Sequence, residues 1–194
     1  MQEREYDHIL ANAFRPLKLS RDTHIDFFEM WEEVDYKKHE FITEAGNVDR
    51  YFYVVVTGVQ CLYIIAPNGD KQVIGFSFDG SFSGIYDSFV YKTPSHYFLE
   101  ALTSTKLLRI NKTQYDSLFI TYPEFEHWGR VVHLQLLVGR VNREVELITK
   151  TSKERFEAFM ERCPPHLEKI PQKYLAWYLN MTPETYSRMR ALKS

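Results

Sequence analysis

The residues best suited to chemistry lie near the C-terminal end of the chain, in the segment TPETYSRMRA at 182–191. Thr182 is a good helix N-cap and Pro183 suits the first helical position, so the segment predicts a short helix. One face of that helix would carry an acid, a hydroxyl, a guanidinium and a methyl group, from Glu184, Ser187, Arg188 and Ala191. Tyr186 and Met189 would fall on the opposite face. Polar groups of these kinds hydrogen-bond to the edges of DNA bases, so the pattern predicts a base-reading face.

A second short helix is expected just before it, in the segment KYLAWYLNM at 173–181. Ala176 is small enough for two helices to cross closely, and Asn180 tolerates the left-handed conformation of a tight turn. This spacing is typical of a helix-turn-helix. A helical hairpin that only completes a globular domain has the same pattern and is the alternative.

Charge is distributed unevenly along the chain. Residues 1–123 contain 12 Lys and Arg against 17 Asp and Glu, whereas residues 124–194 contain 12 against 9. From residue 169 onward Glu184 is the only acid, and the bases are Lys169, Lys173, Arg188, Arg190 and Lys193. A basic end on an otherwise acidic chain indicates phosphate binding, and a solvated helix surface is the alternative.

The composition is that of a globular protein, with 44% hydrophobic and 26% charged residues over 194 positions. No N-terminal signal sequence is evident, and no segment has the roughly eighteen apolar residues of a membrane span. Cys61 and Cys163 are too far apart to indicate a metal cluster, and the histidines lack metal-ligand spacing. We therefore expect a cytoplasmic protein with no membrane contact, no bound metal and no cofactor.

The residue pattern of the N-terminal part predicts a helix followed by a series of strands. The segment DTHIDFFEMWEEV has helical spacing of its apolar residues, Ile25, Phe28 and Trp31, with Asp22 or Thr23 as a cap. From Tyr36 the chain is rich in β-branched and aromatic residues between glycines, which is typical of an all-β sandwich or barrel. Asn68-Gly69 is a strong hairpin signal, and a helix capped by Asn111 is expected after the last strand.

Residues 124–150 are expected to form a long helix with a heptad seam. Its apolar residues alternate at spacings of three and four, in the order Val131, Leu134, Val138, Val141, Val145 and Ile148. The seam predicts a homodimer in which this helix packs against its copy, with Gly139 permitting a close backbone approach. A core helix in a monomer is the alternative, because the seam is shorter than three to four heptads.

The whole is therefore expected to be an α+β protein in three parts, a β-domain with a preceding helix at 1–123, a long helix at 124–150 and a small all-helical domain at 151–194. In this order the chain resembles the Crp/Fnr family of transcription regulators. The resemblance is carried by FITEAGNVDRYFYVVVTGV, APNGDKQVIGFSFDGSFSG and TPETYSRMR. It implies a double-stranded β-helix (jelly-roll-like) sensor barrel, a dimerisation helix and a helix-turn-helix domain.

The resemblance also implies a partner and residue roles. Members of the family bind double-stranded DNA as homodimers, with two recognition helices about 34 Å apart in successive major grooves. Arg188 would pair with guanine, and Glu184 would accept a hydrogen bond from cytosine. The other contacts to bases and phosphates would come from Lys173, Thr182, Thr185, Ser187 and Arg190.

The ligand cassette departs from the family pattern. In members that bind cyclic nucleotides an acid holds the ribose and an arginine neutralises the phosphate, but Ile85 and Ser95 stand at those positions here. Each lost charge-assisted hydrogen bond costs about 1.5–3 kcal/mol, so cAMP is not expected in the usual pose. An unknown small-molecule effector and a filled, ligandless barrel are both open. The candidate pocket residues are Gly84, Ile85, Tyr86, Ser95, His96 and Tyr97.

Two further function classes are alternatives to DNA binding. A sensor or interaction module without DNA binding is the runner-up, because no β-hairpin wing follows the last helix in this sequence. A cupin-like enzyme would need a metal held by neighbouring histidines, and the sequence has no His-x-His pair. An enzyme is therefore not expected.

Overall fold

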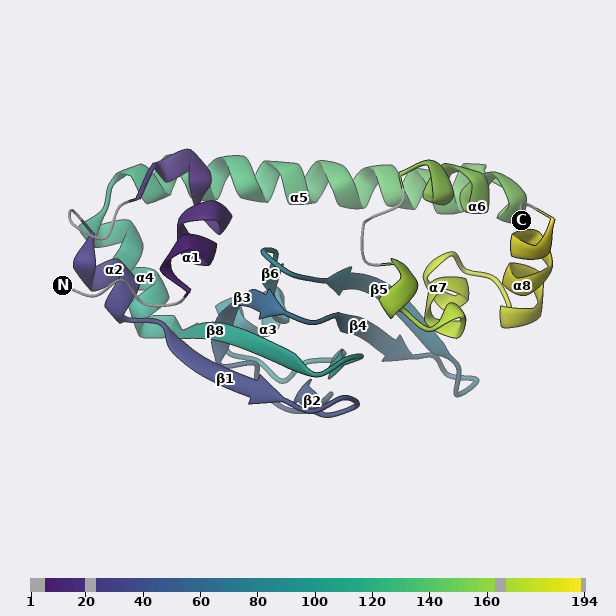
Figure 1. The fold of residues 1–194 in the computed structure, drawn as a ribbon, viewed down its shortest axis with the longest axis horizontal. Helices are drawn as coiled ribbons and strands as arrows, with labels where there is room; N and C mark the ends of the chain where they lie inside the picture. The colour runs from purple at the N-terminus through teal and green to yellow at the C-terminus, as the bar shows by residue number, and fades with distance from the viewer. Residues whose placement is uncertain (1–5, 20–23, 163–166, 193–194) are drawn as a thin grey trace. The chain divides into compact units, whose positions relative to one another are not determined.

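The structure is a computed structural model, shown in Figure 1, and describes residues 6–19, 24–162 and 167–192. Its Cα positions group into two compact units, residues 1–62 with 76–130 and residues 63–75 with 131–194. The chain combines α-helices with antiparallel β-sheets, which confirms the predicted α+β class. None of the described helices has both the length and the apolar character needed to cross a bilayer.

The described strands form a sandwich of two four-stranded sheets. The order in one sheet is β1 (Glu32–Tyr36), β8 (Thr105–Asn111), β3 (Tyr51–Thr57) and β6 (Phe82–Ser83). The order in the other is β2 (Phe41–Thr43), β7 (Phe98–Ala101), β4 (Gln60–Ile65) and β5 (Lys71–Ser77). Side chains alternate between the two faces of a strand, so the alternating apolar residues of these segments meet between the sheets.

Helices precede, interrupt and follow the strands of the first unit. Along the chain they are α1 (Asp7–Ala13), the 3₁₀ turn η1 (Arg15–Leu17), α2 (Ile25–Glu29), α3 (Tyr86–Tyr91), α4 (Lys112–Thr121) and the start of α5 (Glu124–Thr149). Asn111 caps α4 as predicted, in a reciprocal capping box with Gln114. These caps satisfy amides that a helix leaves without internal partners.

An aromatic cluster joins the helices of this unit to its sheet. Phe14 is fully buried, and its ring lies 4.8 Å from that of Trp128 and 5.1 Å from that of Phe82, centroid to centroid. Phe125 belongs to the same cluster. Since Phe125 and Trp128 are on the first turns of α5, the cluster fixes where the long helix begins.

The second unit contains the outer part of the β4–β5 hairpin and the remaining helices. The hairpin turns at Asn68-Gly69 as predicted, with Gly69 at a φ of +87°. Beyond α5 the helices are α6 (Ser152–Glu161), the 3₁₀ turn η2 (Leu167–Lys169), α7 (Gln172–Tyr178) and α8 (Pro183–Ala191). The predicted long helix is thus confirmed, since α5 covers all but the last residue of 124–150.

Two local expectations need correction. The helix predicted through Trp31 ends at Glu29, because the alternating residues from Glu32 onward pair as β1 with β8. Trp31 is buried in the aromatic cluster although it is not helical. The predicted caps at Asp22 and Thr23 lie outside the described residues, and His24 occupies the N-cap position of α2.

Gly58, in the turn between β3 and β4, provides a test of the sandwich. It has a φ of +109°, and a Cβ built there would lie 2.7 Å from the carbonyl oxygen of Ser104. Gly58→Ala is therefore expected to lose about 1–2 kcal/mol of unfolding free energy through backbone strain and about 1–3 kcal/mol more through overpacking. Urea denaturation followed by circular dichroism measures the loss.

Gly46→Ala is the matched control, because Gly46 has a φ of +89° but, apart from its chain neighbours, no described residue has an atom within 4 Å of its built Cβ. This variant should lose only the part of the unfolding free energy that comes from backbone strain, about 1–2 kcal/mol. Equal losses for the two variants would show that the turn relaxes and that the contact with Ser104 does not constrain it.

Candidate nucleic-acid interface

α8 begins as predicted and has a buried side and a free side. The Oγ1 of Thr182 accepts a hydrogen bond from Thr185 N at 3.3 Å, and Pro183 stands in the first turn. Tyr186 is 2% exposed, and its ring packs edge-on against Phe156 of α6 with centroids 5.4 Å apart. The helix is therefore held by the side opposite to the predicted base-reading face.

The residues predicted to contact DNA lie mostly in solvent. The exposed ones are Lys173, Thr182, Glu184, Ser187, Arg188 and Arg190. Thr185 is half-buried. A hydrogen bond from its own amide and another from Thr182 lower the pKa of Glu184, so its carboxylate is ionised at neutral pH. The free side of α8 thus presents the carboxylate of Glu184, the hydroxyl of Ser187 and the guanidinium of Arg188.

The turn between α7 and α8 lies at the predicted position. Asn180 has a φ of +52°, the left-handed conformation expected there. The amide of Asn180 donates to Trp177 O, and the amide of Met181 donates to Ala176 O, each at 3.1 Å. Ala176 is fully buried, in agreement with its predicted place between closely crossing helices.

Arg155 of α6 holds this turn, although nothing in the sequence pattern predicted it. Its buried guanidinium donates from Nε to Leu179 O at 2.9 Å and from Nη2 to Asn180 O at 3.1 Å. Its Nη1 donates to Lys150 O at 2.6 Å. The last carbonyls of a helix lack internal partners and carry partial negative charge, so a cation at this position stabilises the end of α7.

Arg143 of α5 binds the same end of α7. Its Nη2 donates to Tyr178 O at 2.6 Å and to Val73 O of the hairpin at 3.2 Å. The guanidinium also lies over the Tyr178 ring, 3.8 Å from the ring centroid, where a cation is attracted to the aromatic face. Burial lowers the pKa of Arg143, but a guanidinium remains charged at neutral pH. One side chain therefore connects the long helix, the hairpin and the turn.

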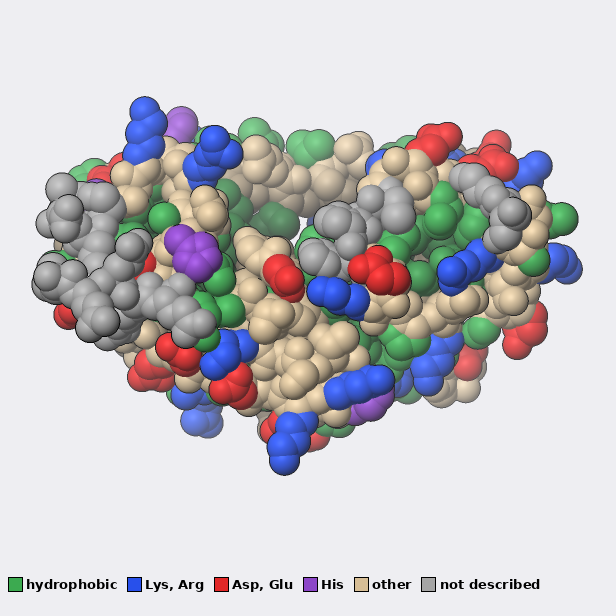
Figure 2. Space-filling view, in the orientation of Figure 1, with side chains coloured by type: hydrophobic (Ala, Val, Ile, Leu, Met, Phe, Trp, Pro, Cys, Tyr) green, Lys and Arg blue, Asp and Glu red, His purple; other side chains and the backbone are tan. Residues whose placement is uncertain are grey.

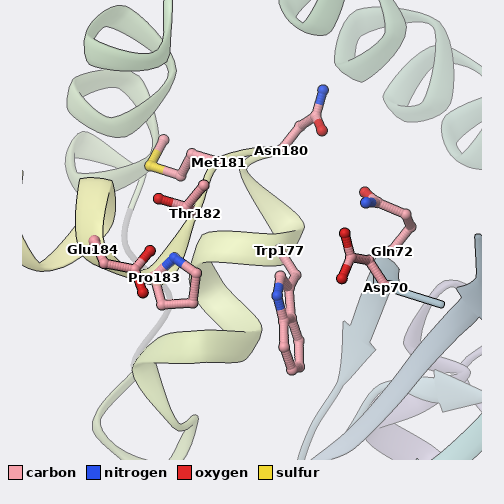
Figure 3. A pocket seen from close by; sticks show the side chains of 8 residues that line it. All are labelled: Asp70, Gln72, Trp177, Asn180, Met181, Thr182, Pro183 and Glu184. Carbon is pink, nitrogen blue, oxygen red and sulfur yellow. The ribbon is translucent and has the colours of Figure 1, made fainter. Parts of the chain in front are cut away.

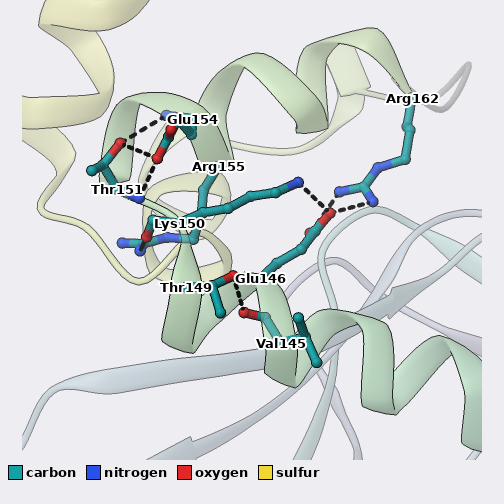
Figure 4. Close-up of polar contacts among 8 residues, drawn as sticks. All are labelled: Val145, Glu146, Thr149, Lys150, Thr151, Glu154, Arg155 and Arg162. Carbon is teal, nitrogen blue, oxygen red and sulfur yellow. Dashed lines mark hydrogen bonds and ion pairs between the residues drawn. The ribbon is translucent and has the colours of Figure 1, made fainter.

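Two local motifs stabilise the corner between α5 and α6 (Figure 4). Thr151 caps α6 in a reciprocal capping box with Glu154, whose Oε2 accepts from Thr151 N at 2.8 Å. Glu146 accepts two hydrogen bonds from Arg162, at 2.7 and 2.8 Å, and one from Lys150 at 3.0 Å. The hydrogen bond from Arg162 is the main reason that the pKa of Glu146 falls to about 2.

A pocket of about 390 Å³ opens beside the N-terminus of α8 (Figure 3). Asp70 and Gln72 of the hairpin lie on one side of it. The other side is lined by Trp177, Asn180, Met181, Thr182, Pro183 and Glu184. Because Asp70 and Glu184 both carry carboxylates, the pocket is unfavourable for a phosphate group.

The six candidate ligand residues of the β-domain have different environments. Ile85 and Ser95 are buried, Gly84 and Tyr97 are half-buried, and Tyr86 and His96 are exposed. The hydroxyl of Tyr86 lies 3.3 Å from that of Tyr115. Effector binding by these residues stays a prediction.

α5 carries an exposed apolar stripe along the predicted seam, and Figure 2 shows apolar side chains reaching the surface there. Five seam residues are between 47% and 75% exposed, namely Leu134, Val138, Val141, Val145 and Ile148. Val131 is half-buried. Among the described residues, no atom outside the local helix backbone lies within 4 Å of a Cβ built on Gly139, so they do not make the close approach expected at this glycine. A close approach does occur at Gly129, whose built Cβ lies 2.9 Å from the Phe119 ring.

Comparison with known proteins identifies the β-domain. Residues 33–122, from β1 to the end of α4, match the family of cyclic nucleotide-binding domains. A curated relative, the nitrogen fixation regulation protein FixK of Bradyrhizobium diazoefficiens, is 30% identical over 60 residues. That stretch is 31% of this chain and 25% of FixK, so the chain matches about a quarter of that relative's length.

Solved structures extend the likeness beyond the β-domain. FixK2 from Bradyrhizobium japonicum superposes with a TM-score of 0.74 at 21% identity, over 84% of this chain and 83% of FixK2. The c-di-GMP responsive global regulator CLP of Xanthomonas campestris gives a TM-score of 0.71 at 17% identity, over 90% and 92%. Residues 33–122 therefore have the sequence of a cyclic nucleotide-binding domain, and the chain as a whole has the fold of these regulators.

Replacing Arg155 tests how the α7–α8 turn is held. Arg155→Met keeps most of the apolar volume but leaves the carbonyl groups of Leu179 and Asn180 without their donor. The expected loss is about 2–4 kcal/mol of unfolding free energy, since each buried unsatisfied acceptor costs about 1–3 kcal/mol. Urea denaturation of the full chain measures it.

Lys153→Met is the control for this variant. Lys153 is an exposed side chain of the same helix, paired with Glu157 at the surface, and exposed pairs contribute about 0–1 kcal/mol. If both variants lost the same free energy, the buried contacts of Arg155 would not be what holds the turn.

Proposed function

We propose that this protein is a dimeric, sequence-specific DNA-binding regulator of transcription of the Crp/Fnr type, with α8 as its recognition helix. The observation that carries the proposal is the orientation of α8. Tyr186 is buried while Glu184, Ser187 and Arg188 are exposed on the other side. A helix held in this way can enter a major groove without losing its own packing.

These side chains can each pair with a chemical group of DNA. The guanidinium of Arg188 suits the paired acceptors of guanine, and the ionised carboxylate of Glu184 suits the amino group of cytosine. Thr182, Thr185 and Ser187 can donate to phosphate near the helix N-terminus. Lys173 and Arg190 add sequence-independent attraction to the DNA backbone, which weakens as salt increases.

The exposed stripe of α5 supports a homodimer. Its seam residues leave a row of apolar side chains in water on a single chain, and packing two such rows together removes that surface. A symmetric pair would carry two copies of α8, as a palindromic operator requires.

The N-terminal domain is proposed to act as the sensor of this regulator. It matches the cyclic nucleotide-binding domains but has Ile85 and Ser95 where charged ligand contacts are expected. We therefore propose that this domain does not respond to cAMP bound in the usual pose. We also propose that the protein acts in the cytoplasm.

Selection of genomic DNA fragments by the purified full chain tests DNA binding directly. On a selected site, Arg188→Ala should weaken binding by roughly 5- to 150-fold, which corresponds to about 1–3 kcal/mol for one bidentate base contact. Fluorescence anisotropy at fixed salt measures the affinity. Lys153→Ala, an exposed change on α6, should bind as the unaltered chain does.

Unchanged selectivity in Arg188→Ala would remove the base-reading role of this residue. Recovery of no fragment at all would favour the alternative function, a sensor or interaction module without DNA binding.

The dimer is tested on α5 with a pair of matched changes. Val138→Asp puts a charge in the seam and should shift the protein to monomer in analytical ultracentrifugation, because burying an unpaired carboxylate is costly. Leu136→Asp is the control, since Leu136 is equally exposed but lies about 200° around the helix from Val138. If the Val138→Asp variant still sedimented as a dimer, the dimer interface would not be the seam of α5.

A further inference from the structure

The pocket beside α8 combines two separated acids with an apolar middle. Its lining residues all belong to the second unit, and its volume of about 390 Å³ is that of a small-molecule site. Asp70 of the hairpin and Glu184 of α8 bring carboxylates to opposite sides of it (Figure 3). Trp177 of α7 lies between them in that view. Met181 and Pro183 add further apolar surface.

The two sides of the pocket are held together by arginines of α5. Arg143 Nη2 donates both to Val73 O of the hairpin, at 3.2 Å, and to Tyr178 O at the end of α7, at 2.6 Å. Arg140 Nη1 donates to Ile74 O of the hairpin at 3.1 Å. Because these bonds fix the hairpin and α7 on one helix, the pocket is formed within the chain before any ligand arrives. A ligand then binds with little cost in ordering its site.

The hairpin offers the pocket a carboxylate and an amide, but not its ammonium group. Asn68 Nδ2 donates to Asp70 Oδ2 at 2.7 Å, and Asp70 N donates to Asn68 Oδ1 at 3.1 Å, so the Asp70 side chain is oriented. Side chains alternate along a strand, and Lys71 points away, with its Nζ 4.1 Å from the centroid of the Tyr63 ring. Gln72 then lines the pocket again.

The helical side adds a second charge and an aromatic face. A hydrogen bond from its own amide and another from Thr182 lower the pKa of Glu184, so this carboxylate is ionised at neutral pH. The half-buried Trp177 ring packs edge-on against the buried Tyr174, with centroids 5.2 Å apart. The face of an indole attracts cations within about 6 Å, and Lys173 Nζ already lies 5.9 Å from this ring centroid.

We propose that this pocket binds a small organic dication, an alkyl chain with an amino or guanidino group at each end. One cationic end pairs with Asp70 and the other with Glu184, while the chain covers the Trp177 ring. The two carboxylates lie on opposite sides, so an extended ligand suits them better than a metal ion does. The described residues likewise contain no group of three His, Cys, Asp or Glu side chains suited to a metal.

A ligand in this pocket would control access to the recognition helix, and this second part rests on the proposed DNA-binding function. Thr182 and Glu184 line the pocket and are also proposed to contact DNA. A carboxylate paired with a ligand cation cannot accept a hydrogen bond from cytosine. The dication and DNA therefore exclude each other, and the dication acts as a negative effector.

Titration of the full chain with alkyl diamines of four, six and eight carbons tests the site without DNA. The indole N–H signal of Trp177, identified by its absence in Trp177→Phe, is followed by nuclear magnetic resonance at pH 7 and constant ionic strength. At least one diamine should shift it saturably, while the signals of Trp31 and Trp128, each 3% exposed, stay in place. That diamine should bind about 2- to 5-fold more tightly than the monoamine of equal length, since an exposed ion pair contributes up to about 1 kcal/mol.

Two variants show whether the preference comes from the pocket. Asp70→Asn keeps the shape of the side chain but removes its charge, and should bind the diamine and the monoamine equally. Glu168→Gln removes an exposed acid of the same unit that does not line the pocket, and should keep the preference. The site would be refuted if no diamine shifted the Trp177 signal saturably, or if Asp70→Asn kept the full preference.

Competition with DNA is measured by fluorescence anisotropy on a selected fragment. Diamines also bind DNA phosphates, and comparing the unaltered chain with Asp70→Asn removes that shared effect. At a diamine concentration ten times its Kd, DNA binding should weaken roughly two- to fourfold more in the unaltered chain than in Asp70→Asn. Equal weakening would overturn the effector role. If the chain selected no DNA, the proposed function would fail, and the titration of Trp177 would still decide whether the pocket binds a dication.

Discussion

The hydrogen bonds from Arg155 to the carbonyls of Leu179 and Asn180 are the contact on which the rest of the C-terminal unit depends. They satisfy the end of α7 at the residues where the chain turns into α8. The same guanidinium binds Lys150 O just after α5, so one buried cation links α5, α6 and the turn. This turn sets the direction in which α8 continues, and the buried Tyr186 packs the helix against α6.

Features encoded by local signals were predictable from the sequence. The cap at Thr182, the left-handed Asn180, the Asn68-Gly69 hairpin and the cap at Asn111 each involve residues within a few positions of one another. The long helix was also predictable, because its apolar spacing extends over many turns. The end of α2 was not, since Trp31 fits a helical stripe but is buried beyond the helix.

The residues that position the candidate sites were not predictable for a physical reason. Arg143 and Arg155 bind backbone carbonyls, which every residue has, so no partner side chain marks them in the sequence. The pocket beside α8 was hidden as well, because Asp70 and Glu184 lie far apart in the sequence and only the fold brings them to opposite sides of one hollow. The roles of the exposed α8 residues in DNA reading and of the seam in pairing stay predictions from the sequence.

Arg143 makes the energetics of two distant segments interdependent. Its Nη2 carries only two hydrogen atoms, and it donates to both Val73 O and Tyr178 O. Because one nitrogen holds both carbonyls, a substitution that moves either of them shifts the guanidinium and changes its hydrogen bond to the other. Stability changes from substitutions in the hairpin and in α7 should therefore not add, and the shortfall of the double change would measure how strongly the two segments are coupled.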